Sequence, residues 1–593
     1  MTTLHAAHVA LPVSALREAT VVCPGCSTGC RVSATVGDGR MPLLAADSAA
    51  APNFGRTCDR VNQLSEKAGR LWDRLRFPMM RRHRGDDLGR VSWDQALTHA
   101  ADEIQRAQIS RGRQSVGWLD LGRLDMESAY LFAKLFKGFL GSNNTDVLGG
   151  QRAATQLYTR AFGADGSPAC FDDIEHAQVI LLADIDLATT HPVLFERIMD
   201  HRLASPHCRL MVIDSKRTTT ASRADVYVPA APGKTATILQ LVAKRLLAQG
   251  HFDARFVRRQ SEGFTDYRVL LESMDETVLL SQCGVHPGRI DEIVEFVADG
   301  SRLLSFTSST SGQRDSDESG PSEQRSREVG AALVNLQLQL GQVGQGGTGL
   351  FMLDEIDLPF DPATVGVGAA LLPGHRSVGS ASQRLWLEQT WGVLEGSIPI
   401  QPGLNAEQML AAAGQRELSV LWLTGEPIDP QLTSEPSFLE ALAAVDFVIL
   451  QTSDAGSPLA QHADVLLPSA HWLETTGTTV NAERRVLRSH RLLDPPGEAK
   501  PDWWVAARTA EFMGFAGFHY DHVGEVWNEL ISLTADTVCD YSGLRDERLG
   551  GEPMHWPCPH RHHPGLARRY ASGRFLTPSG RARFLPMNIS HAG

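Results

Sequence analysis

The sequence predicts an α/β protein with a small, cysteine-bearing, β-rich module followed by two doubly wound α/β units. Two observations predict this fold class. Short apolar stretches typical of buried strands alternate with helical patterns in two separate parts of the chain, which is typical of parallel sheets covered by helices. Four cysteines gather near the N-terminus, before the first of these parts. The 593 residues, 42% hydrophobic and 21% charged, have the composition of a multidomain globular protein.

The N-terminal module, predicted over residues 1–82, is defined by its thiols. Cys23, Cys26 and Cys30 lie within eight residues of one another, and Cys58 follows at a distance. A tight run of three cysteines plus one distant cysteine is typical of the ligands of an iron–sulfur cluster. A set of buried free cysteines and a zinc site are the alternatives, although zinc usually takes its ligands as two separated pairs. The spacing therefore favours an iron–sulfur cluster.

The first part of an α/β domain is predicted over residues 83–168. Ser92 is a suitable N-cap for a helix in which apolar residues recur at helical spacing as far as Ile104. Residues 116–119 then have the pattern of a strand, and residues 128–140 that of a second helix. This alternation begins the first parallel sheet.

A Rossmann-like nucleotide-binding domain is predicted over residues 169–330. Its expected strands are 177–183, 210–214 and 226–229, and its expected helices are 191–199 and 235–249. Ligands of open α/β sheets bind beyond the carboxyl ends of the strands, so Asp214 and Arg217 are placed to hold a nucleotide. Ordinary capping and surface roles are the alternative for both residues, because a fold does not imply a function.

The same topology is predicted again over residues 331–535, the second part of the α/β domain and a second nucleotide site. A polar stretch at 308–326, expected to be a mobile loop or disordered, precedes it. The expected strands are 420–423, 447–450 and 465–468. Two units of this size predict two nucleotides, or one dinucleotide-like pair.

Composition excludes several classes of protein. The net charge of −13, from 56 basic and 69 acidic residues, argues against a nucleic-acid-binding chain. No run of 18 apolar residues predicts a membrane span, and residues 1–20 lack the pattern of a secretory or twin-arginine signal. Nine cysteines in a long chain without such a signal do not indicate a disulfide framework. We therefore expect a cytoplasmic protein.

Motifs spread over nearly the whole chain add a resemblance. Besides the four cysteines they are Val91–Asp94, Arg160–Gly166, Ala169–Asp173, Thr190–Val193, Ile213–Thr218, Pro232–Gly233, Pro402–Leu404, Ala463–Pro468, Glu474–Arg485 and Thr577–Phe584. In this order and spacing the chain resembles the molybdopterin oxidoreductase family, and within it most closely the cytoplasmic assimilatory nitrate reductases.

The resemblance implies two cofactors. One is a [4Fe–4S] cluster on Cys23, Cys26, Cys30 and Cys58, and the other is Mo-bis(molybdopterin guanine dinucleotide), in which two pterin dithiolenes hold molybdenum. Arg60 stands where the family usually has a lysine between cluster and pterin. The pterin-nucleotide contacts implied by position are Asp214, Arg217, Gly233, Gly425, Asp454, Asn481 and Glu483.

The sequence departs from the family pattern in three places. Gly150 stands where these nitrate reductases have a molybdenum-binding cysteine, leaving Gln151 and Arg152 to act beyond the metal's first ligands. Arg152 can attract a small anionic substrate by its charge, and the alternative is that it merely begins a surface helix. Acidic residues replace the usual turns at 183–186 and 424–427, where carboxylates repel a pyrophosphate unless they are paired. Residues 536–593 are expected to form a tail leading to a covering domain that is missing or supplied by a second chain.

Two functional classes remain open on the sequence. The first is a molybdopterin-dependent oxidoreductase, nitrate reductase-like, that works with an electron donor or acceptor protein by oxygen-atom or two-electron transfer. The second is a non-catalytic iron–sulfur subunit for electron transfer or structure, which has kept the fold and the cluster but lost molybdenum.

Overall fold

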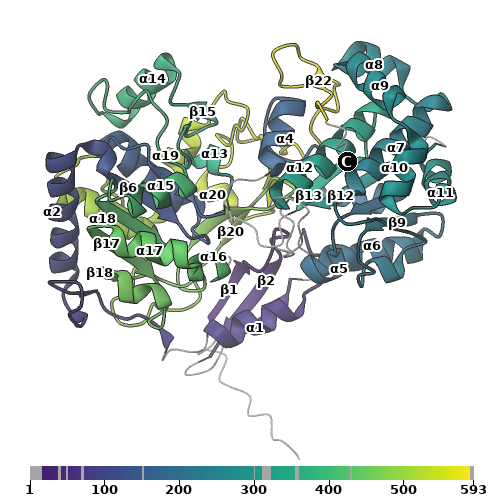
Figure 1. The fold of residues 1–593 in the computed structure, drawn as a ribbon. Helices are drawn as coiled ribbons and strands as arrows, with labels where there is room; N and C mark the ends of the chain where they lie inside the picture. Colours follow the sequence, from purple (N-terminus) through teal and green to yellow (C-terminus); the bar gives the residue numbers. More distant parts are fainter. Residues whose placement is uncertain are drawn as a thin grey trace, which may run out of the picture.

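Two α/β lobes stand side by side above a small β module in the computed structural model (Figure 1). The structure describes residues 17–37, 42–47, 51–68, 73–149, 153–298, 301–309, 322–353, 360–427 and 430–587. We call the lobes the seven-stranded and the five-stranded lobe after their central sheets. This architecture confirms the predicted α/β class with its N-terminal β-rich module.

The N-terminal module is a three-stranded antiparallel sheet with one helix. Its elements are β1 Arg17–Val22, β2 Arg31–Val36, β3 Leu43–Ala46 and α1 Asp59–Ala68. Strands β1 and β2 form a hairpin whose last pair is Val22 with Arg31. The loop of this hairpin is therefore the segment that carries the first three cysteines. The backbone N–H of Cys23 donates to the carbonyl of Cys30 at 2.9 Å and closes the loop.

The seven-stranded lobe combines chain segments that are far apart in the sequence. In spatial order its strands are β5 Gly89–Arg90, β4 Met79–Met80, β18 Val465–Pro468, β17 Phe447–Thr452, β16 Val420–Thr424, β6 Val116–Asp120 and β7 Thr145–Val147. The five from β18 to β7 run parallel, and β4 and β5 complete one edge in antiparallel pairing. Trp118 of β6 stacks on Phe132 in the buried centre, with ring centroids 4.9 Å apart.

Helices cover both lobes. Those of the seven-stranded lobe are α2 Trp93–Arg111, α3 Met126–Ala133, α13 Pro362–Val365, α14 Ala381–Trp391, α15 Ala406–Gly414, α16 Pro430–Ser434, α17 Pro436–Ala444, α18 Asp502–Phe512, α19 Val523–Leu533 and α20 Asp546–Leu549. The helix expected over 128–140 is in fact two elements, because α3 passes into a π-helix at Lys134–Leu140. A π-helix is a rare local widening that sequence periodicity does not indicate.

The five-stranded lobe is a wholly parallel sheet. Its spatial order is β10 Val226–Pro229, β9 Arg209–Asp214, β8 Val179–Ala183, β12 Leu303–Ser308 and β13 Gly349–Leu353. Its helices are α4 Ala153–Phe162, α5 Leu187–Thr190, α6 Pro192–Ala204, α7 Thr235–Ala248, α8 Ala254–Gln260, α9 Phe264–Ser273, α10 Glu276–Cys283, α11 Pro287–Ala298 and α12 Ser322–Gln339. The sheet thus takes its last strand from beyond residue 330, where the sequence placed a domain boundary.

The polar stretch expected at 308–326 falls mostly outside the described residues. Ser308 ends β12, and α12 begins at Ser322. The glycine-rich segment after α12 turns the chain back to β13, and Gly349 adopts a φ of +119° that few other residues tolerate. A Cβ there would lie 2.9 Å from the Cβ of Ala169. Because Gly349 has no side chain, the edge strand β13 can pack closely against Ala169.

The described part of the C-terminal segment is not a free tail but is packed against both lobes. Strand β21 Met554–His555 pairs with β20 Arg485–Ser489, which forms a hairpin with β19 Gly477–Val480. Strand β22 Ala582–Arg583 pairs with β11 Ser261–Glu262 of the five-stranded lobe. A further hairpin joins β14 Leu371–Leu372 and β15 Arg376–Ser377. Across the described ranges, none of the helices has the length and apolarity needed to span a bilayer.

The predicted N-cap of α2 is present and gives a first test of local stability. The Ser92 hydroxyl accepts from the N–H of Gln95 at 3.2 Å, and the Gln95 side chain accepts from the N–H of Ser92 at 3.0 Å. Ser92→Ala removes one of these bonds and is expected to lower the free energy of unfolding by about 1 kcal/mol. Urea unfolding measures this change. Ser92→Asp keeps a capping oxygen and should stay near wild type, so equal losses in both variants would contradict the capping role.

Candidate functional site

The cysteine-bearing hairpin loop is shaped by its glycines and its neighbours. A Cβ on Gly25 would lie 3.3 Å from the Sγ of Cys23. Gly29 has a φ of +64°, and a Cβ there would lie 2.8 Å from the side chain of Leu487 on β20. The Cys26 thiol donates to the hydroxyl of Thr28 at 3.4 Å. The loop is thus held tightly around its sulfur atoms and against the hairpin of the seven-stranded lobe.

The fourth cysteine, Cys58, directly precedes α1. Burial raises the pKa of the Cys23 thiol to about 12, and the charges of Cys26 and Cys58 raise it further. Burial also raises the pKa of Cys30 well above its ordinary value, with the other three cysteines adding to the shift. Within the described ranges, no three His, Cys, Asp or Glu side chains gather closely enough to ligate a single metal ion. The four thiols nevertheless share one largely buried site, which fits the donor set of an iron–sulfur cluster.

Arg60 lies where the sequence predicted it, beside the cysteines. Its guanidinium donates to the carbonyl of Gly25 at 2.9 Å, and to those of Thr190 and Thr189 at 3.0 and 3.1 Å. The first of these bonds is to the cysteine loop and the others are to the end of α5. The fixed positive charge lowers the pKa of the Cys23 thiol, against the larger effect of burial. Arg60 therefore joins the cysteine loop to the five-stranded lobe.

His191 is a buried neighbour of the loop that the sequence did not single out. Its Nε2 lies 2.8 Å from the hydroxyl of Ser27, and its Nδ1 lies 3.0 Å from that of Thr190. Burial lowers the pKa of His191 to about 3, and the charge of Arg60 acts in the same direction. The imidazole is therefore neutral at physiological pH. Only its place in the motif Thr190–Val193 could have drawn attention to it.

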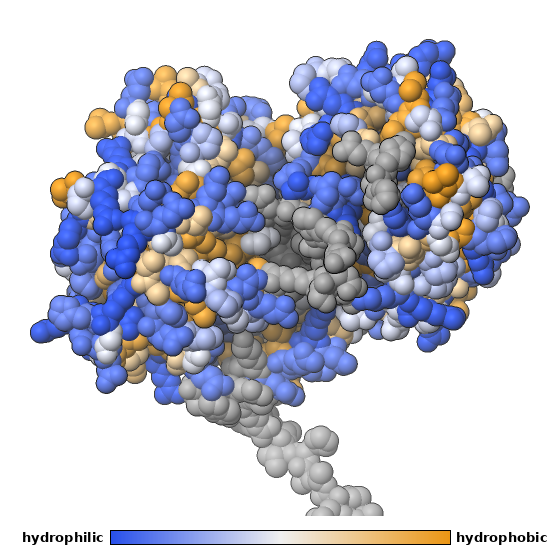
Figure 2. Space-filling view, in the orientation of Figure 1, coloured by the Kyte–Doolittle hydropathy of each residue, from blue (hydrophilic) through white to orange (hydrophobic). Residues whose placement is uncertain are grey.

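A cleft opens beside the cysteines. Its walls come from the cysteine loop, from the ends of strands in the seven-stranded lobe and from β19. Figure 2 shows that the molecular surface is also hollowed between the two lobes. Gly425 lines it with a φ of +82°, where a Cβ would meet the carbonyl of Gly122 at 2.2 Å. Two polar atoms of the walls, Trp472 Nε1 and Thr479 Oγ1, have no hydrogen-bond partner among the described residues. We call this space the main cleft.

A second cleft adjoins the main cleft, with which it shares Ser27, Val480 and Asn481. Asn481 is fixed at this junction, because its amide donates to the carbonyl of Thr28 at 3.0 Å and its oxygen accepts from the N–H of Arg485 at 2.8 Å. The remaining walls come from α4, the segment after α4, the segment around residue 360, and Trp556. The two clefts are therefore neighbours, one beside the cysteines and the other beside α4.

The acidic turns that the sequence flagged are partly neutralised. Asp184 accepts from the hydroxyl of Thr235 at 2.6 Å, and burial raises its pKa to about 7. In the main cleft, burial raises the pKa of Asp125 to about 8 and that of Asp502 to about 6. Glu426 accepts a hydrogen bond from Ser453. The expected repulsion of a pyrophosphate is therefore reduced, because Asp125 is mostly protonated and Asp184 is about half protonated near neutral pH.

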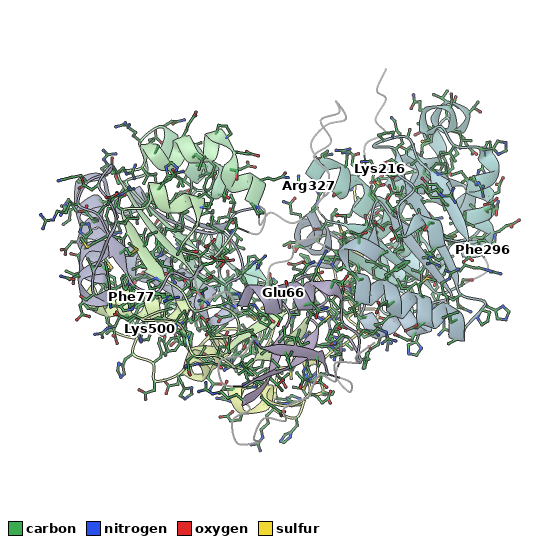
Figure 3. The ribbon with its side chains drawn as sticks, turned by 90° about the horizontal axis from the view of Figure 1, so that it is seen from below. Glu66, Phe77, Lys216, Phe296, Arg327 and Lys500 are labelled. Atoms are coloured by element: carbon green, nitrogen blue, oxygen red, sulfur yellow. The ribbon has the colours of Figure 1, made fainter. Side chains whose placement is uncertain are left out.

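The residues predicted to contact the pterin nucleotides fall into separate groups. Gly425 and Asn481 line the main cleft. Asp214 ends β9 and accepts from the N–H of Lys216 at 2.9 Å, with the exposed Arg217 and Gly233 near the same sheet edge. Lys216 lies on the side of its lobe that faces the seven-stranded lobe (Figure 3). One group thus belongs to the cleft and another to the carboxyl edge of the five-stranded sheet.

Two other predicted contacts lie outside both clefts. Asp454 turns back on its own loop, where it accepts from the N–H of Gly456 at 2.9 Å. Glu483 is fully buried, and its carboxylate accepts from Arg485 at 2.7 Å, from the N–H of Phe171 at 2.8 Å and from other buried groups. These partners hold the pKa of Glu483 well below its ordinary range in spite of its burial. The carboxylate of Glu483 is therefore hydrogen-bonded to other buried groups of the protein.

The predicted positions Gly150, Gln151 and Arg152 lie outside the described residues. Helix α4 begins directly after them, at Ala153, and its residues Ala154, Thr155 and Tyr158 line the second cleft. The roles assigned to residues 150–152 stay predictions.

Comparison with known proteins identifies the family of this chain. The model of the family "Molybdopterin oxidoreductase" matches residues 74–512. The chain belongs to this family. The family "Molybdopterin oxidoreductase Fe4S4 domain" matches residues 18–68, which contain all four cysteines. The zinc alternative and the alternative of free cysteines are thereby set aside in favour of a [4Fe–4S] cluster.

Relatives cover almost all of the chain. A nitrate reductase of Synechocystis is 30% identical over 95% of this chain and 79% of its own length. A nitrate reductase of Shewanella frigidimarina is 30% identical over 95% of this chain, which spans only 61% of that relative. Acetylene hydratase from Pelobacter acetylenicus has a similar fold, with a TM-score of 0.70 at 18% identity over 95% of this chain and 77% of that one.

Membership in this family gives the site its two cofactors, the [4Fe–4S] cluster and Mo-bis(molybdopterin guanine dinucleotide). The structure fits both, because four thiols gather around one loop and a large cleft with unpartnered polar atoms begins beside them. The chain is therefore a molybdopterin-dependent oxidoreductase of nitrate reductase-like ancestry, and the non-catalytic alternative is not favoured.

Proposed function

We propose that the enzyme reduces a small oxoanion of the nitrate class by two-electron oxygen-atom transfer. The observation that supports this most directly is that two adjoining clefts lie between the cysteine loop, with Cys23 and Cys26, and α4. Electrons that enter at the cluster then reach the substrate over a short path inside the protein. The relatives named nitrate reductase support the choice of substrate class.

When bound, the molybdenum cofactor would supply the two-electron redox change and accept or release the transferred oxygen. The residues of this chain would hold and insulate it. Trp472 and Thr479 line the main cleft and carry buried polar atoms with no hydrogen-bond partner among the described residues, and Gly425 keeps the wall clear of side chains. Asp214, Arg217 and Gly233 are proposed to contact the nucleotide at the edge of the five-stranded sheet, while roles of Asp454 and Glu483 toward the cofactor lack support from their contacts.

The test of this function is turnover by the holoenzyme. Protein purified anaerobically from a host that makes the cofactor should contain molybdenum and iron, and should form nitrite from nitrate with a reduced viologen as electron donor. Formate oxidation is measured in parallel, because other relatives are named F420-dependent formate dehydrogenase subunit alpha. Molybdenum-loaded protein that forms no nitrite would overturn the proposed substrate class.

We also propose an electron donor or acceptor protein as a partner. The relative from Methanocaldococcus jannaschii is named as a subunit, so it works within an assembly. A separate chain that covers the cofactor, and a cytoplasmic location, stay predictions from the sequence. A relative from Desulfovibrio desulfuricans is named a periplasmic nitrate reductase. Co-purification of the tagged chain from its native host tests for the partner.

Arg60 is expected to assist electron transfer between cluster and cleft. Its guanidinium holds a fixed positive charge beside Cys23 and stabilises an added electron nearby. Arg60→Gln should slow turnover about tenfold to a hundredfold, the usual range for groups that support a metal site. Arg60→Lys keeps the charge and should retain most activity. Equal rates in all three proteins, with equal iron content, would show that the charge has no such role.

A further inference from the structure

Two carboxyl groups line the wall of the second cleft, and they have different partners. Asp361 receives strong donors: His375 Nε2 lies 2.7 Å from its Oδ2, the hydroxyl of Thr364 donates at 2.7 Å, and the N–H of Ala363 donates to Oδ1 at 3.0 Å. Burial raises the pKa of Asp361, but the charge and hydrogen bond of His375 outweigh it and bring the pKa to about 2. Asp361 is therefore ionised.

Asp165, the other carboxyl group of this wall, has only neutral donors. The hydroxyl of Thr155 donates to its Oδ2 at 2.8 Å, and the N–H of Gly166 donates to its Oδ1 at 2.6 Å. Arg569 is nearby, but its guanidinium donates to the backbone carbonyl of Asp165. Burial raises the pKa of Asp165, and the negative charge of Asp361 raises it further, against a smaller effect of His375. A carboxyl group in this setting keeps its proton at a pH where an ordinary aspartate has lost it.

We propose that Asp165, on the wall of the second cleft beside the Asp361–His375 pair, is the proton donor of this cleft. This rests on the proposed function, because removal of oxygen from an oxoanion consumes two electrons and two protons and releases water. The electrons come from the reduced partner protein. Asp165 supplies one of the two protons to the departing oxygen, and the solvent in the cleft supplies the second proton and then reprotonates Asp165. The division of one ionised and one protonated carboxyl group is the usual arrangement for general acid catalysis.

The remaining charged and titratable groups around the pair do not change this assignment. Those that face it are Arg484, Arg569, Cys539, Tyr541 and Tyr570. Cys539 and Asp361 raise the pKa of His375 well above its ordinary value although burial opposes them, so the imidazolium persists. The Arg484 guanidinium is directed to four backbone carbonyls. The Asp361 charge is thus permanent near neutral pH.

Infrared titration tests the proton directly and without turnover. The purified protein should show a carbonyl band of a protonated carboxylic acid that persists near neutral pH and disappears in Asp165→Asn. Asp361→Asn removes the charge that raises the pKa of Asp165, so the band should titrate at lower pH in that variant. If Asp165→Asn removes no band, or if the band titrates as an ordinary aspartate, the proposal is overturned.

Kinetics supply the second measurement. Asp165→Asn in the holoenzyme should lower kcat about a hundredfold or more with little change in KM, and should leave the iron content and the cluster EPR unaltered. Asp146→Asn is the matched control, because Asp146 is likewise half-buried, has a raised pKa and accepts from two backbone N–H groups, but lies outside both clefts. Its kcat should stay near wild type.

The two proposals fail in different ways. Holoenzyme that reduces nitrate equally fast with and without Asp165 contradicts the proton donor but keeps the function. Holoenzyme that reduces no nitrate but retains the carboxylic acid band removes the substrate class, while the acid form of Asp165 still stands.

Discussion

Cys26→Ser protein is expected to lack the [4Fe–4S] cluster and, with it, all turnover that depends on an external electron donor. Cys26 lies inside the closed hairpin loop, between the paired backbone groups of Cys23 and Cys30. A cluster of this kind needs four thiolates, and a serine hydroxyl at this position does not replace one. Iron should fall from about four atoms per chain to nearly none, with loss of the absorbance and of the EPR signal of the reduced cluster.

The control for this prediction is Cys208→Ser. Cys208 is buried next to the start of β9, where burial raises the pKa of its thiol to about 11, and it takes no part in the hairpin loop. This variant should keep its iron and its activity. A Cys26→Ser protein that still held four irons and a normal EPR signal would show that a different set of ligands holds the cluster.

The sequence predicted those structural features that depend on residues close to one another along the chain. The strands over 177–183, 210–214 and 420–423, the N-cap Ser92 and the four-thiol group were all readable, because each follows from periodicity, capping or spacing. The π-helix at Lys134–Leu140 was not, since a single widened turn leaves the apolar pattern intact. The edge strand β13 was missed because its pairing with β12 is set by the sheet.

The features of the site that the sequence did not predict arise from contacts between segments that are far apart in the chain. Glu483 matched a cofactor-binding motif, yet His555, 72 residues further on, lies 3.1 Å from its carboxylate. Asp361 and His375 belong to no motif, and they approach Asp165 only in the folded chain. The acidic turns suggested repulsion, but burial and hydroxyl donors change the protonation of Asp184 and the cleft carboxyls. Residue types indicated the chemistry, and tertiary packing decided the partners.

Arg484→Met is expected to destabilise the fold by at least about 4 kcal/mol, a much larger loss than that expected for Ser92→Ala. The guanidinium is fully buried and donates to four carbonyls: Ser167 at 2.7 Å, Trp556 at 2.6 Å, Leu566 at 3.0 Å and Ala567 at 2.6 Å. These carbonyls belong to the segment after α4 and to two parts of the C-terminal segment. One side chain thus ties the β19–β20 hairpin to both.

The magnitude follows from the groups that lose their partner. A buried carbonyl without a donor costs about 1–3 kcal/mol. Methionine removes the donor from the buried carbonyls of Ser167 and Trp556 and from the part-buried carbonyls of Leu566 and Ala567. Gly166 shows how tightly the side chain fits, because a Cβ there would lie 2.5 Å from the Cδ of Arg484. Arg484→Lys keeps a charge but offers a single nitrogen to carbonyls that point to one planar fork, so it should also lose most of the stabilisation.

Denaturant unfolding followed by tryptophan fluorescence measures this loss, since Trp556 contributes one of the four carbonyls and its ring lies 5.7 Å from the guanidinium carbon. Arg259→Met, at an exposed position near the end of α8, is the matched control and should stay within about 0.5 kcal/mol of wild type. If the two variants unfold at the same denaturant concentration, the four bonds of Arg484 do not hold the hairpin to the C-terminal segment. A different outcome is that only Arg484→Met unfolds at a lower denaturant concentration and that it also loses molybdenum while it keeps its iron. In that case the hydrogen bonds of Arg484 stabilise the two clefts that share Asn481 and not the cysteine loop.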